Sequence, residues 1–444
     1  MNFAHNVKNW SGTDDIAGEN QIVRPKNVEE IIQCIGNNTK PLRLCGSRYS
    51  SPALLRCPID TQLIDMSGVS GLRSINSKTA TFGGGTLLKD VYAILLAYDA
   101  ILPCSPGVIG EQTLAGALAT GTHGQGLGQS ALSDAVQSFE VVTMDKRVLN
   151  VQAGEPYFDA FLLSLGVLGI ITNVELRHIT NRIFSCAKSV IHFNEFCDGY
   201  MQWNEEATFV KAWWFPETQQ VHLWRVTPSQ RTHASLKDES PRTFGNVLLA
   251  DSALNDTVAR SRQRMLADTG MPIDTRPLYQ TVERFANFQD VTGNVYDILC
   301  KGIPAAQINV EIGIPFAQSI SALKAIACAI REQKISLHYP IILRAVGPSS
   351  AWLSPAHDGA TCYFGMVVYT DDDGRTDPTA LKATRTLEHL LAGIGGRPHW
   401  GKFFDPCLYD MRLLYPRIAE FNTLRSSLDP LRRLTNAFVD TLLT

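Results

Sequence analysis

The chain has 444 residues, which is too long for one compact hydrophobic core, and we therefore expect two domains. Hydrophobic residues make up 45% of it and charged residues 19%, with a formal net charge of -3. These values exclude a disordered protein and give no basic field that would steer nucleic acid.

The first residues lack the basic start and the continuous apolar stretch of a secretory signal, so we expect a cytoplasmic protein. The longest apolar run, at 162–171, is interrupted by serine and glycine and is too short to cross a bilayer, which predicts no membrane span. The ten cysteines are scattered without CxxC pairs. We therefore expect no metal site, and most thiols should be buried in a reducing compartment.

Strand and helix signals alternate in the first hundred residues. Residues 21–25 are typical of a strand end, and an amphipathic helix is predicted from residue 28 with Asn27 as its cap. Residues 41–46 (PLRLCG) form an apolar strand that ends at a glycine, and residues 79–86 (TATFGGGT) repeat this design before a helix at 87–97. The chain therefore contains two junctions between a strand and a glycine loop.

Around residues 207–224 the chain becomes dense in aromatic residues with strand character, and we place the start of a second domain near residue 180. The elements predicted there follow from periodicity and composition. They are strands at 209–215, 221–224 and 363–369, an exposed loop at 227–241, a helix at 317–332, and a helical stretch at 415–443 that packs on the first domain.

Residues 103–128 place glycine wherever a chain must approach a ligand closely, because absent side chains let backbone N–H groups reach a pyrophosphate or a flavin ring. Ordinary loops are the alternative. The fingerprint GxGxxG between a strand and a helix is missing, which disfavours a nicotinamide-binding Rossmann domain.

The strings QTLAGA at 112–117 and ATGTHG at 119–124 resemble the flavin-binding segment of the vanillyl-alcohol oxidase, or PCMH-type FAD-binding, superfamily in its aldonolactone and alditol oxidase branch. Other strings agree with this branch in order along nearly the whole chain. They are NWSG at 9–12, Arg43 with GS at 46–47, GGGT at 83–86, LGVLGIIT at 165–172, WWFP at 213–216, EIGIP at 311–315, WLSP at 352–355 and RPHWGK at 397–402.

The resemblance implies an α+β fold in three parts. These are a PCMH-type FAD-binding domain at 1–180, a substrate or cap domain on an antiparallel sheet at 181–410, and a C-terminal helical segment at 411–444 that returns to the first domain. It also implies a set of FAD contacts. These are Arg43, Gly46, Ser47, Arg48, Tyr49, Ser50, Gly84, Gly107, Gln112, Thr113, Gly116, Ala117, Thr120, Gly121, His123, Gly124, Gly169, Ile171 and Lys402.

Two positions, Tyr49 and Ile342, depart from the branch's pattern. Tyr49 stands where most members carry a histidine bonded to the flavin, which predicts noncovalent FAD, and Cys104 is the remaining candidate for a covalent link through a thiol. Alditol oxidases place Glu-x-Arg over the flavin, whereas this chain has Ile342 before Leu343 and Arg344. Loss of that carboxylate argues against a simple polyol and favours a modified sugar or a secondary metabolite.

The chemistry implied is hydride transfer from a carbon bearing a hydroxyl or amine to flavin N5. Arg344 or Lys402 would stabilise negative charge near flavin N1, and Lys402, His399 or Glu311 would take the substrate proton, with Lys402 first. His123 is expected to hold the flavin loop rather than act as a base. Gly107 matches a position where a small residue admits O2, which favours an oxidase that makes H2O2.

Two alternatives stay open at this point. One is an oxygen-independent flavin dehydrogenase or a sugar oxidase in an epimerisation, and the other is a non-catalytic binding protein on a flavin fold. A small-molecule substrate and O2 are the expected partners, and oligomeric state is not predicted.

Overall fold

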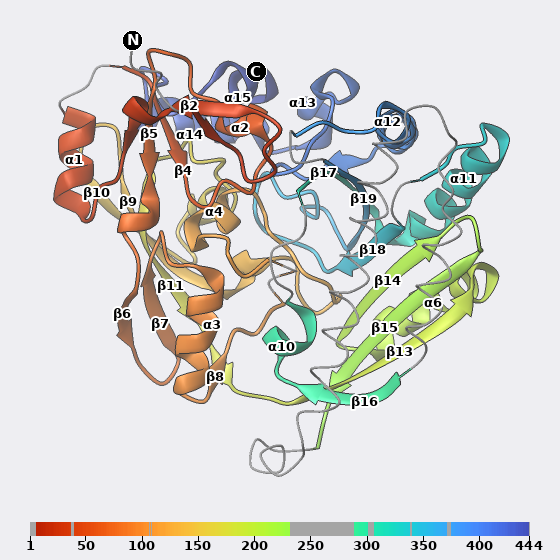
Figure 1. Ribbon diagram of the computed structural model, residues 1–444. Coiled ribbons are helices and arrows are strands. Elements are labelled where there is room, and N and C mark those ends of the chain that lie inside the picture. The colour runs from red at the N-terminus through yellow and green to blue at the C-terminus, as the bar shows by residue number, and fades with distance from the viewer. Residues whose placement is uncertain are drawn as a thin grey trace.

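The computed structural model describes residues 6–36, 40–105, 107, 109–230, 288–300, 306–337, 340–370 and 374–443. Two β-rich parts lie side by side, one built by residues before about 180 and the other by those after it (Figure 1). Helices and sheets are both abundant and the large sheets are antiparallel, which confirms the predicted α+β class.

A small parallel sheet begins the first part, with β5 (Gln62–Asp65) between β3 (Ile22–Val23) and β4 (Leu42–Cys45). Helix α1 (Val28–Gly36) crosses between β3 and β4, burying Ile31 and Ile35, and the Glu30 N–H donates to Asn27 Oδ1 over 2.9 Å. The predicted cap is therefore confirmed. The hairpin of β1 (Asn6–Lys8) and β2 (Asp15–Gly18) and the short α2 (Pro52–Leu55) complete this layer.

A five-stranded antiparallel sheet follows in the order β10–β9–β11–β7–β6. Helices α3 and α4 and the short α5 also belong to this part, and β8 and β12 form a separate two-stranded sheet. The bounds are β6 (Leu72–Ile75), β7 (Thr79–Gly83), α3 (Leu88–Ala97), β8 (Ala100–Ile101), α4 (Leu114–Ala119), β9 (Val136–Val142), β10 (Val148–Gln152), α5 (Phe158–Phe161), β11 (Ile170–Arg177) and β12 (Ile179–Thr180).

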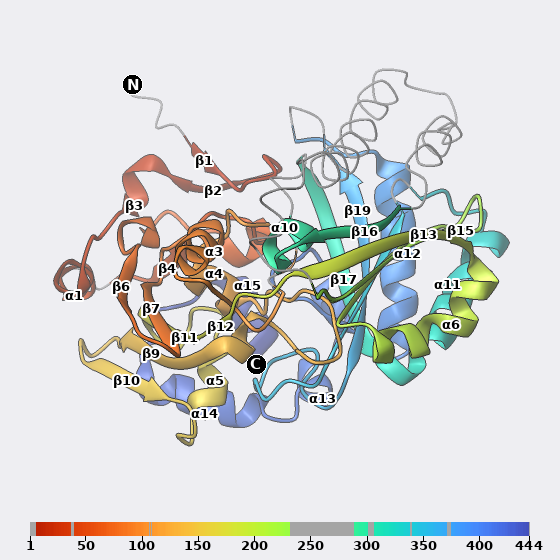
Figure 2. The same cartoon turned by 90° about the horizontal axis from the view of Figure 1, so that it is seen from below.

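The second part is built on an eight-stranded antiparallel sheet. In spatial order its strands are β16 (Phe288–Gly293), β13 (Phe184–His192), β15 (Gln220–Pro228), β14 (Phe209–Phe215), β18 (Ile341–Val346), β19 (Thr361–Tyr369), β17 (Gln307–Pro315) and β20 (Arg397–Pro398). Helices α6 (Phe193–Glu206), α11 (Ser319–Glu332) and α12 (Pro378–Gly393) cover one face. Figure 2 shows the opposite face turned toward the N-terminal part. The short α10 (Val295–Leu299) follows β16.

Strands predicted at 209–215, 221–224 and 363–369 and the helix at 317–332 are confirmed within two to four residues. The exposed loop predicted at 227–241 is wrong at its start, because β15 continues to Pro228. From residue 231 onward that predicted loop lies outside the described residues.

The C-terminal stretch is not one continuous helix. It consists of α13 (Met411–Leu414), α14 (Ile418–Leu428) and α15 (Ala437–Leu443), and the break contains Pro430, which has no N–H to continue a helix. Within the break, Leu42 N donates to Arg433 O over 2.7 Å, so this segment lies against β4. None of the helices in the described ranges has the length and apolar character needed to span a membrane.

Candidate active site

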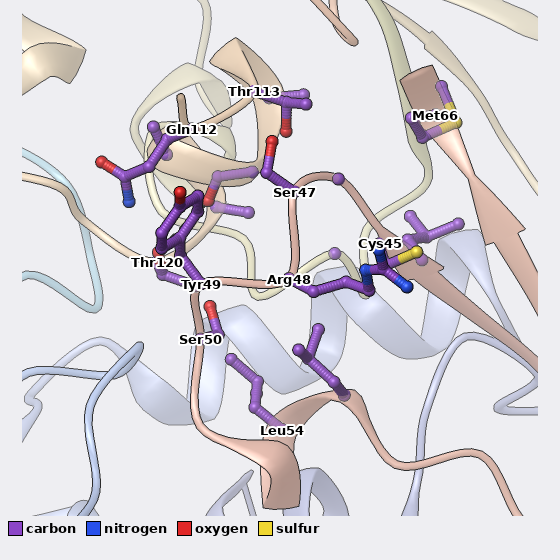
Figure 3. Close-up of a pocket in the computed structure, with 18 of the residues that line it drawn as sticks. Cys45, Ser47, Arg48, Tyr49, Ser50, Leu54, Met66, Gln112, Thr113 and Thr120 are labelled. Atoms are coloured by element: carbon purple, nitrogen blue, oxygen red, sulfur yellow. Dashed lines mark hydrogen bonds between the residues drawn. The ribbon is translucent and has the colours of Figure 1, made fainter. Parts of the chain in front are cut away.

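A cleft of about 790 Å³ lies in the N-terminal part, between the loop that follows β4 and helix α4. Figure 3 shows Ser47 and Thr113 on facing sides with their hydroxyls pointing toward one another, and Tyr49 beside Gln112. We call it the first cleft. Its lining includes Arg43, residues 44–50, Leu54, Leu55, Met66, Gln112, Thr113, residues 115–117, Ala119, Thr120, residues 164–166, Gly169 and Ile171.

Glycine is required where the β4 loop meets α4. A Cβ on Gly46 would lie 1.9 Å from Thr113 Oγ1, so a side chain there would force the two walls of the cleft apart. On the opposite wall, Gly169 has φ +135, and a Cβ on it would lie 2.4 Å from Val141 Cγ1. These two glycines keep the first cleft narrow.

The first cleft fits the diphosphate of FAD. Arg43 is buried in it, with Nε donating to Leu54 O and Nη1 to Leu165 O, and burial lowers its pKa to about 10, which leaves the guanidinium charged at neutral pH. Within the described part of the chain, the backbone N–H groups of residues 47–50 donate to no protein acceptor. Unused N–H groups beside a buried cation suit an anionic phosphate.

Six of the expected FAD contacts lie outside the lining of the first cleft. Gly107, His123 and Lys402 line the second cleft described below, whereas Gly84, Gly121 and Gly124 line neither cleft. A Cβ on Gly84 would lie 2.5 Å from Ile171 O, and one on Gly124 would lie 2.3 Å from Ser105 Oγ. Gly121 has φ +74. Close packing therefore explains glycine at positions 84 and 124, and backbone conformation explains it at position 121. These residues support the loops of the first cleft without lining it.

Tyr49 lies where the first cleft opens into a second one. It lines both clefts, packs against Trp10 with ring centroids 5.1 Å apart, and burial with the charge of Glu111 raises its pKa to about 12. Cys104 is elsewhere. Its side chain is 1% exposed, it lines neither cleft, its Sγ lies 4.0 Å from Leu132 O, and burial raises its pKa.

The second cleft, of about 1200 Å³, lies between the first cleft and the open face of the eight-stranded sheet. It shares Tyr49, Ser50, Gln112 and Thr120 with the first cleft. The two clefts are therefore continuous, and a ligand bound in one can extend into the other. Its other lining residues are Trp10, Gly107, Ile109, Thr122, His123, Lys211, Trp213, Gln307, Asn309, Glu311, Ile342, Arg344, Val367, Tyr369, His399, Gly401, Lys402 and Phe403.

Strand register explains which residues of the sheet meet in the second cleft. Ile342 on β18 pairs with Gly365 on β19, and Gly365 pairs with Glu311 on β17. A Cβ on Gly365 would lie 3.3 Å from Ile342 Cβ and 3.7 Å from Glu311 Oε1. Because Gly365 has no side chain, the space above it is left to the long side chains on either side.

Arg344 Nη2 and Glu311 Oε1 form a short ion pair in that space. Position 342 lacks a carboxylate as the sequence showed, yet the arginine has a carboxylate partner from a strand two places away. The Glu311 side chain is 2% exposed. Burial raises its pKa, but the neighbouring charges, Arg344 first among them, lower it by more, and the pKa lies well below its usual range.

The segment that follows β20 brings His399 and Lys402 to the same place. His399 N donates to Glu311 O over 2.9 Å, and Trp400 Nε1 donates to Leu353 O over 2.6 Å, which anchors the segment on β17 and on a loop behind it. Burial lowers the pKa of His399 and of Lys402, and the nearby Arg344 lowers both further. Gly401 O accepts from Ser51 N over 3.0 Å, so the segment also touches the β4 loop.

His123, Glu311 and His399 form a buried trio whose ligand atoms lie within 4.8 Å of one another, the one group of this kind in the described part of the chain. Such a trio could bind a metal ion. Arg344 forms an ion pair with Glu311, and the charge of Lys402 lowers the pKa of Glu311. These two cations would repel a divalent metal ion at the trio.

The structure thus gathers all four predicted catalytic residues, Lys402, Arg344, Glu311 and His399, in the second cleft together with Gly107 and His123. Sequence reasoning did not select Lys211 or Asn309, which also line it. The sequence does contain an indication for Lys211. A lysine within the aromatic strand FVKAWWF must face either a hydrophobic core or a functional site.

Comparisons with known proteins agree with this geometry. A family model described as D-arabinono-1,4-lactone oxidase matches residues 174–442, and one described as FAD binding domain matches residues 20–152. An alditol oxidase of Streptomyces sp. is 25% identical over 98% of this chain and 99% of its own length. An L-gulono-1,4-lactone dehydrogenase of Mycobacterium tuberculosis is 26% identical over 97% of each chain.

Among solved structures, a variant of the cholesterol oxidase from Brevibacterium sterolicum superposes with a TM-score of 0.75 at 17% identity, covering 100% of this chain and 97% of the other. At that identity the likeness shows the fold alone, and it confirms the predicted FAD-binding fold. The family match covers more than half of the chain and includes the strands that carry Glu311 and Arg344 and the segment that carries Lys402. The chain therefore belongs to the D-arabinono-1,4-lactone oxidase family and is an FAD-dependent oxidoreductase.

Proposed function

We propose that this enzyme is an oxidase that takes a hydride from a carbon bearing a hydroxyl, or an amine, and delivers the electrons to O2, giving H2O2. The observation that carries the proposal is the junction of the two clefts at Tyr49, Ser50, Gln112 and Thr120. A cofactor cradle on one side of that junction faces ionisable side chains suited to an alcohol on the other.

FAD, when bound, supplies the acceptor for the hydride. The residues that would hold it are those of the first cleft, with Arg43 and the N–H groups of residues 47–50 facing its diphosphate. We propose that it is held without a covalent bond, which is supported by tyrosine at position 49 and by the burial of Cys104 outside both clefts.

The cations of the second cleft would stabilise negative charge. Burial lowers the pKa of Lys402 and the Glu311 carboxylate opposes this shift, and Arg344 is fixed by Glu311. Because Glu311 is ionised and paired with Arg344, it is a weak proton acceptor and acts here by holding the arginine in place.

The substrate is proposed to be partly apolar, such as a modified sugar or a secondary metabolite. Trp10, Trp213, Ile342, Val367 and Phe403 supply apolar surface to the second cleft. The relatives' printed names specify alditols and aldonolactones, which carry several hydroxyls, and the Glu311–Arg344 pair offers polar contacts of the kind a hydroxyl needs.

Gly107 supports an oxidase. It lines the second cleft with φ +85, and a Cβ there would lie 2.6 Å from His123 O and 3.5 Å from Arg344 Nη1. A larger residue would therefore narrow the space through which O2 approaches. An oxygen-independent dehydrogenase is the second candidate, favoured by the dehydrogenase among the relatives.

The test uses the purified yellow protein and a panel containing xylitol, D-sorbitol, L-gulono-1,4-lactone, D-arabinono-1,4-lactone and less polar secondary alcohols and amines. Anaerobic bleaching of the flavin identifies substrates. Peroxide formed in air is then compared with reduction of an artificial dye. We expect peroxide at a rate similar to that of bleaching, and fast dye reduction without peroxide would identify a dehydrogenase.

We also propose domain limits at residues 180 and 410. The first is supported by the change from the family match at 20–152 to the one at 174–442, and the second by the helices α13, α14 and α15 that begin at residue 411. A cytoplasmic location is proposed as well. It is supported by ten cysteines that are all free thiols, as is usual in a reducing compartment.

A further inference from the structure

The two histidines of the second cleft are fixed in opposite hydrogen-bonding states. His123 Nδ1 lies 3.0 Å from Gly124 O. A backbone carbonyl only accepts, so Nδ1 must carry a hydrogen and the neutral ring presents a bare lone pair at Nε2. His399 Nδ1 instead accepts from Gly401 N over 3.1 Å, so the neutral ring carries its hydrogen on Nε2.

The bare nitrogen of His123 has no donor in the described structure. Nε2 is buried without a hydrogen-bond partner, and Glu311 Oε1 lies 3.6 Å from it. Both atoms are acceptors when Glu311 is ionised, so neither satisfies the other. A buried acceptor left in this state is costly, and a hydroxyl delivered by a ligand would satisfy it.

Residue His123 is held in position at its ring and at its backbone. Tyr363 stacks on it with centroids 3.7 Å apart and an interplanar angle of 20°, and Arg344 Nη1 donates to the His123 backbone carbonyl over 3.4 Å. A base that is fixed in this way loses little entropy when a substrate arrives.

We propose that His123 is the catalytic base of this enzyme, accepting at Nε2 the proton of the substrate hydroxyl. This rests on the proposed function of the second cleft. As the proton leaves oxygen for Nε2, the hydride leaves the adjoining carbon for the bound cofactor with both electrons of the C–H bond. The alcohol becomes a carbonyl, and His123 becomes an imidazolium 3.6 Å from the Glu311 carboxylate.

The charges around His123 are consistent with this role. Burial lowers the pKa of the ring, Arg344 on β18 lowers it further, and Glu311 on β17 raises it, so the ring is neutral at pH 7. His399 and Lys402, after β20, and Tyr363 on β19 also face this space, and the titratable groups of Tyr49, Lys211 on β14 and Tyr369 on β19 line the same cleft. The role differs from the sequence-based expectation that His123 only holds the flavin loop.

The first test is independent of turnover. Nitrogen NMR of the holoenzyme labelled with ¹⁵N-histidine, assigned with His123→Asn and His399→Asn, reads the protonation of each ring nitrogen. We expect His123 with hydrogen on Nδ1 only and His399 with hydrogen on Nε2 only. A neutral His123 that carries its hydrogen on Nε2 overturns the proposal, whether or not any compound of the panel is a substrate.

The second test uses whichever panel compound bleaches the wild-type flavin. We expect His123→Asn to slow anaerobic bleaching by roughly 10²- to 10⁴-fold, with FAD content and substrate affinity little changed, and imidazole to restore part of the rate in His123→Ala. His399→Asn should mainly weaken substrate binding. His178→Asn, outside both clefts, is the matched control.

The pH profile separates a base from a structural residue. The bleaching rate should rise with pH through the pKa of His123, and this limb should vanish in His123→Asn. In Glu311→Gln the limb should move to lower pH, because Glu311 raises that pKa. A full bleaching rate in His123→Asn or His123→Gln with normal FAD content refutes the proposal. A wild type that no panel compound bleaches refutes the proposed substrate class instead, and the NMR result then decides on His123.

Discussion

Replacing Gly46 with alanine should weaken FAD binding through one contact. The added Cβ would lie 1.9 Å from Thr113 Oγ1 and 2.8 Å from its Cβ and Cγ2, whereas ordinary van der Waals contact begins at 3.4 Å. Because Thr113 is the N-cap of helix α4 and Gly46 directly follows strand β4, neither residue moves freely, and the two walls of the first cleft must separate.

The size of the effect follows from the cost of overpacking a well-packed site, about 1–3 kcal/mol. If that cost falls on the bound state, the Kd for FAD rises roughly 5- to 150-fold, since each tenfold corresponds to about 1.4 kcal/mol. Titration of the apoprotein with FAD, followed by tryptophan fluorescence, measures the Kd directly.

Two companion variants make this result specific. A Cβ on Gly128 would meet nothing within 4 Å, so Gly128→Ala should bind FAD like the wild type. Gly46→Ala combined with Thr113→Gly removes the contacts with the Thr113 side chain and should recover most of the affinity. Equal FAD affinity in Gly46→Ala and Gly128→Ala would show that the β4 loop does not form the cofactor cradle.

The remaining predictions concern the cofactor link and the charged cluster. Acid precipitation should release all of the yellow colour, because Tyr49 has no nitrogen to bond the flavin, and Cys104→Ser should leave FAD content unchanged; colour retained on the wild-type pellet and lost in Cys104→Ser would reverse this. Glu311→Gln should lower the free energy of unfolding by roughly 3 kcal/mol in denaturant titrations, because it leaves the buried Arg344 charge uncompensated, and adding Arg344→Met should recover part of the loss. The bleaching rate should fall at alkaline pH, below the ordinary lysine pKa of 10.5, because burial lowers the pKa of Lys402 and its charge is lost above that pKa; Lys402→Met should lack this alkaline limb.

The features predicted well from the sequence are those fixed by local chemistry. Glycine at positions 46 and 169 is required by close contacts of the backbone, so the strings that contain them identified the cleft walls. Strand β14, a run of seven residues with one charge, was equally visible because aromatic residues favour strands. The C-terminal stretch is helical, as its apolar pattern predicts, and Pro430 lies in the break between α14 and α15.

The features missed from the sequence depend on which strands become neighbours. Lys211 and Asn309 lie almost a hundred residues apart and reach the same cleft only through the order β14–β18–β19–β17. The opposite states of His123 and His399 were also hidden, since each depends on one backbone group of the following loop. The hydrophobic periodicity of the sequence gives no indication of such contacts.

The carboxylate beside Arg344 shows why a motif comparison can be right about residues and incomplete about the site. The motif expects the acid two residues before the arginine on the same strand, and position 342 is isoleucine. Glu311 supplies the charge from β17, and it reaches Arg344 because Gly365, on the strand between them, leaves the space open. The pair is therefore a property of three strands. A substrate in this cleft meets an acid and an arginine above Gly365, with the apolar Ile342 beside them, and this combination argues for a ligand that carries both hydroxyl and apolar groups.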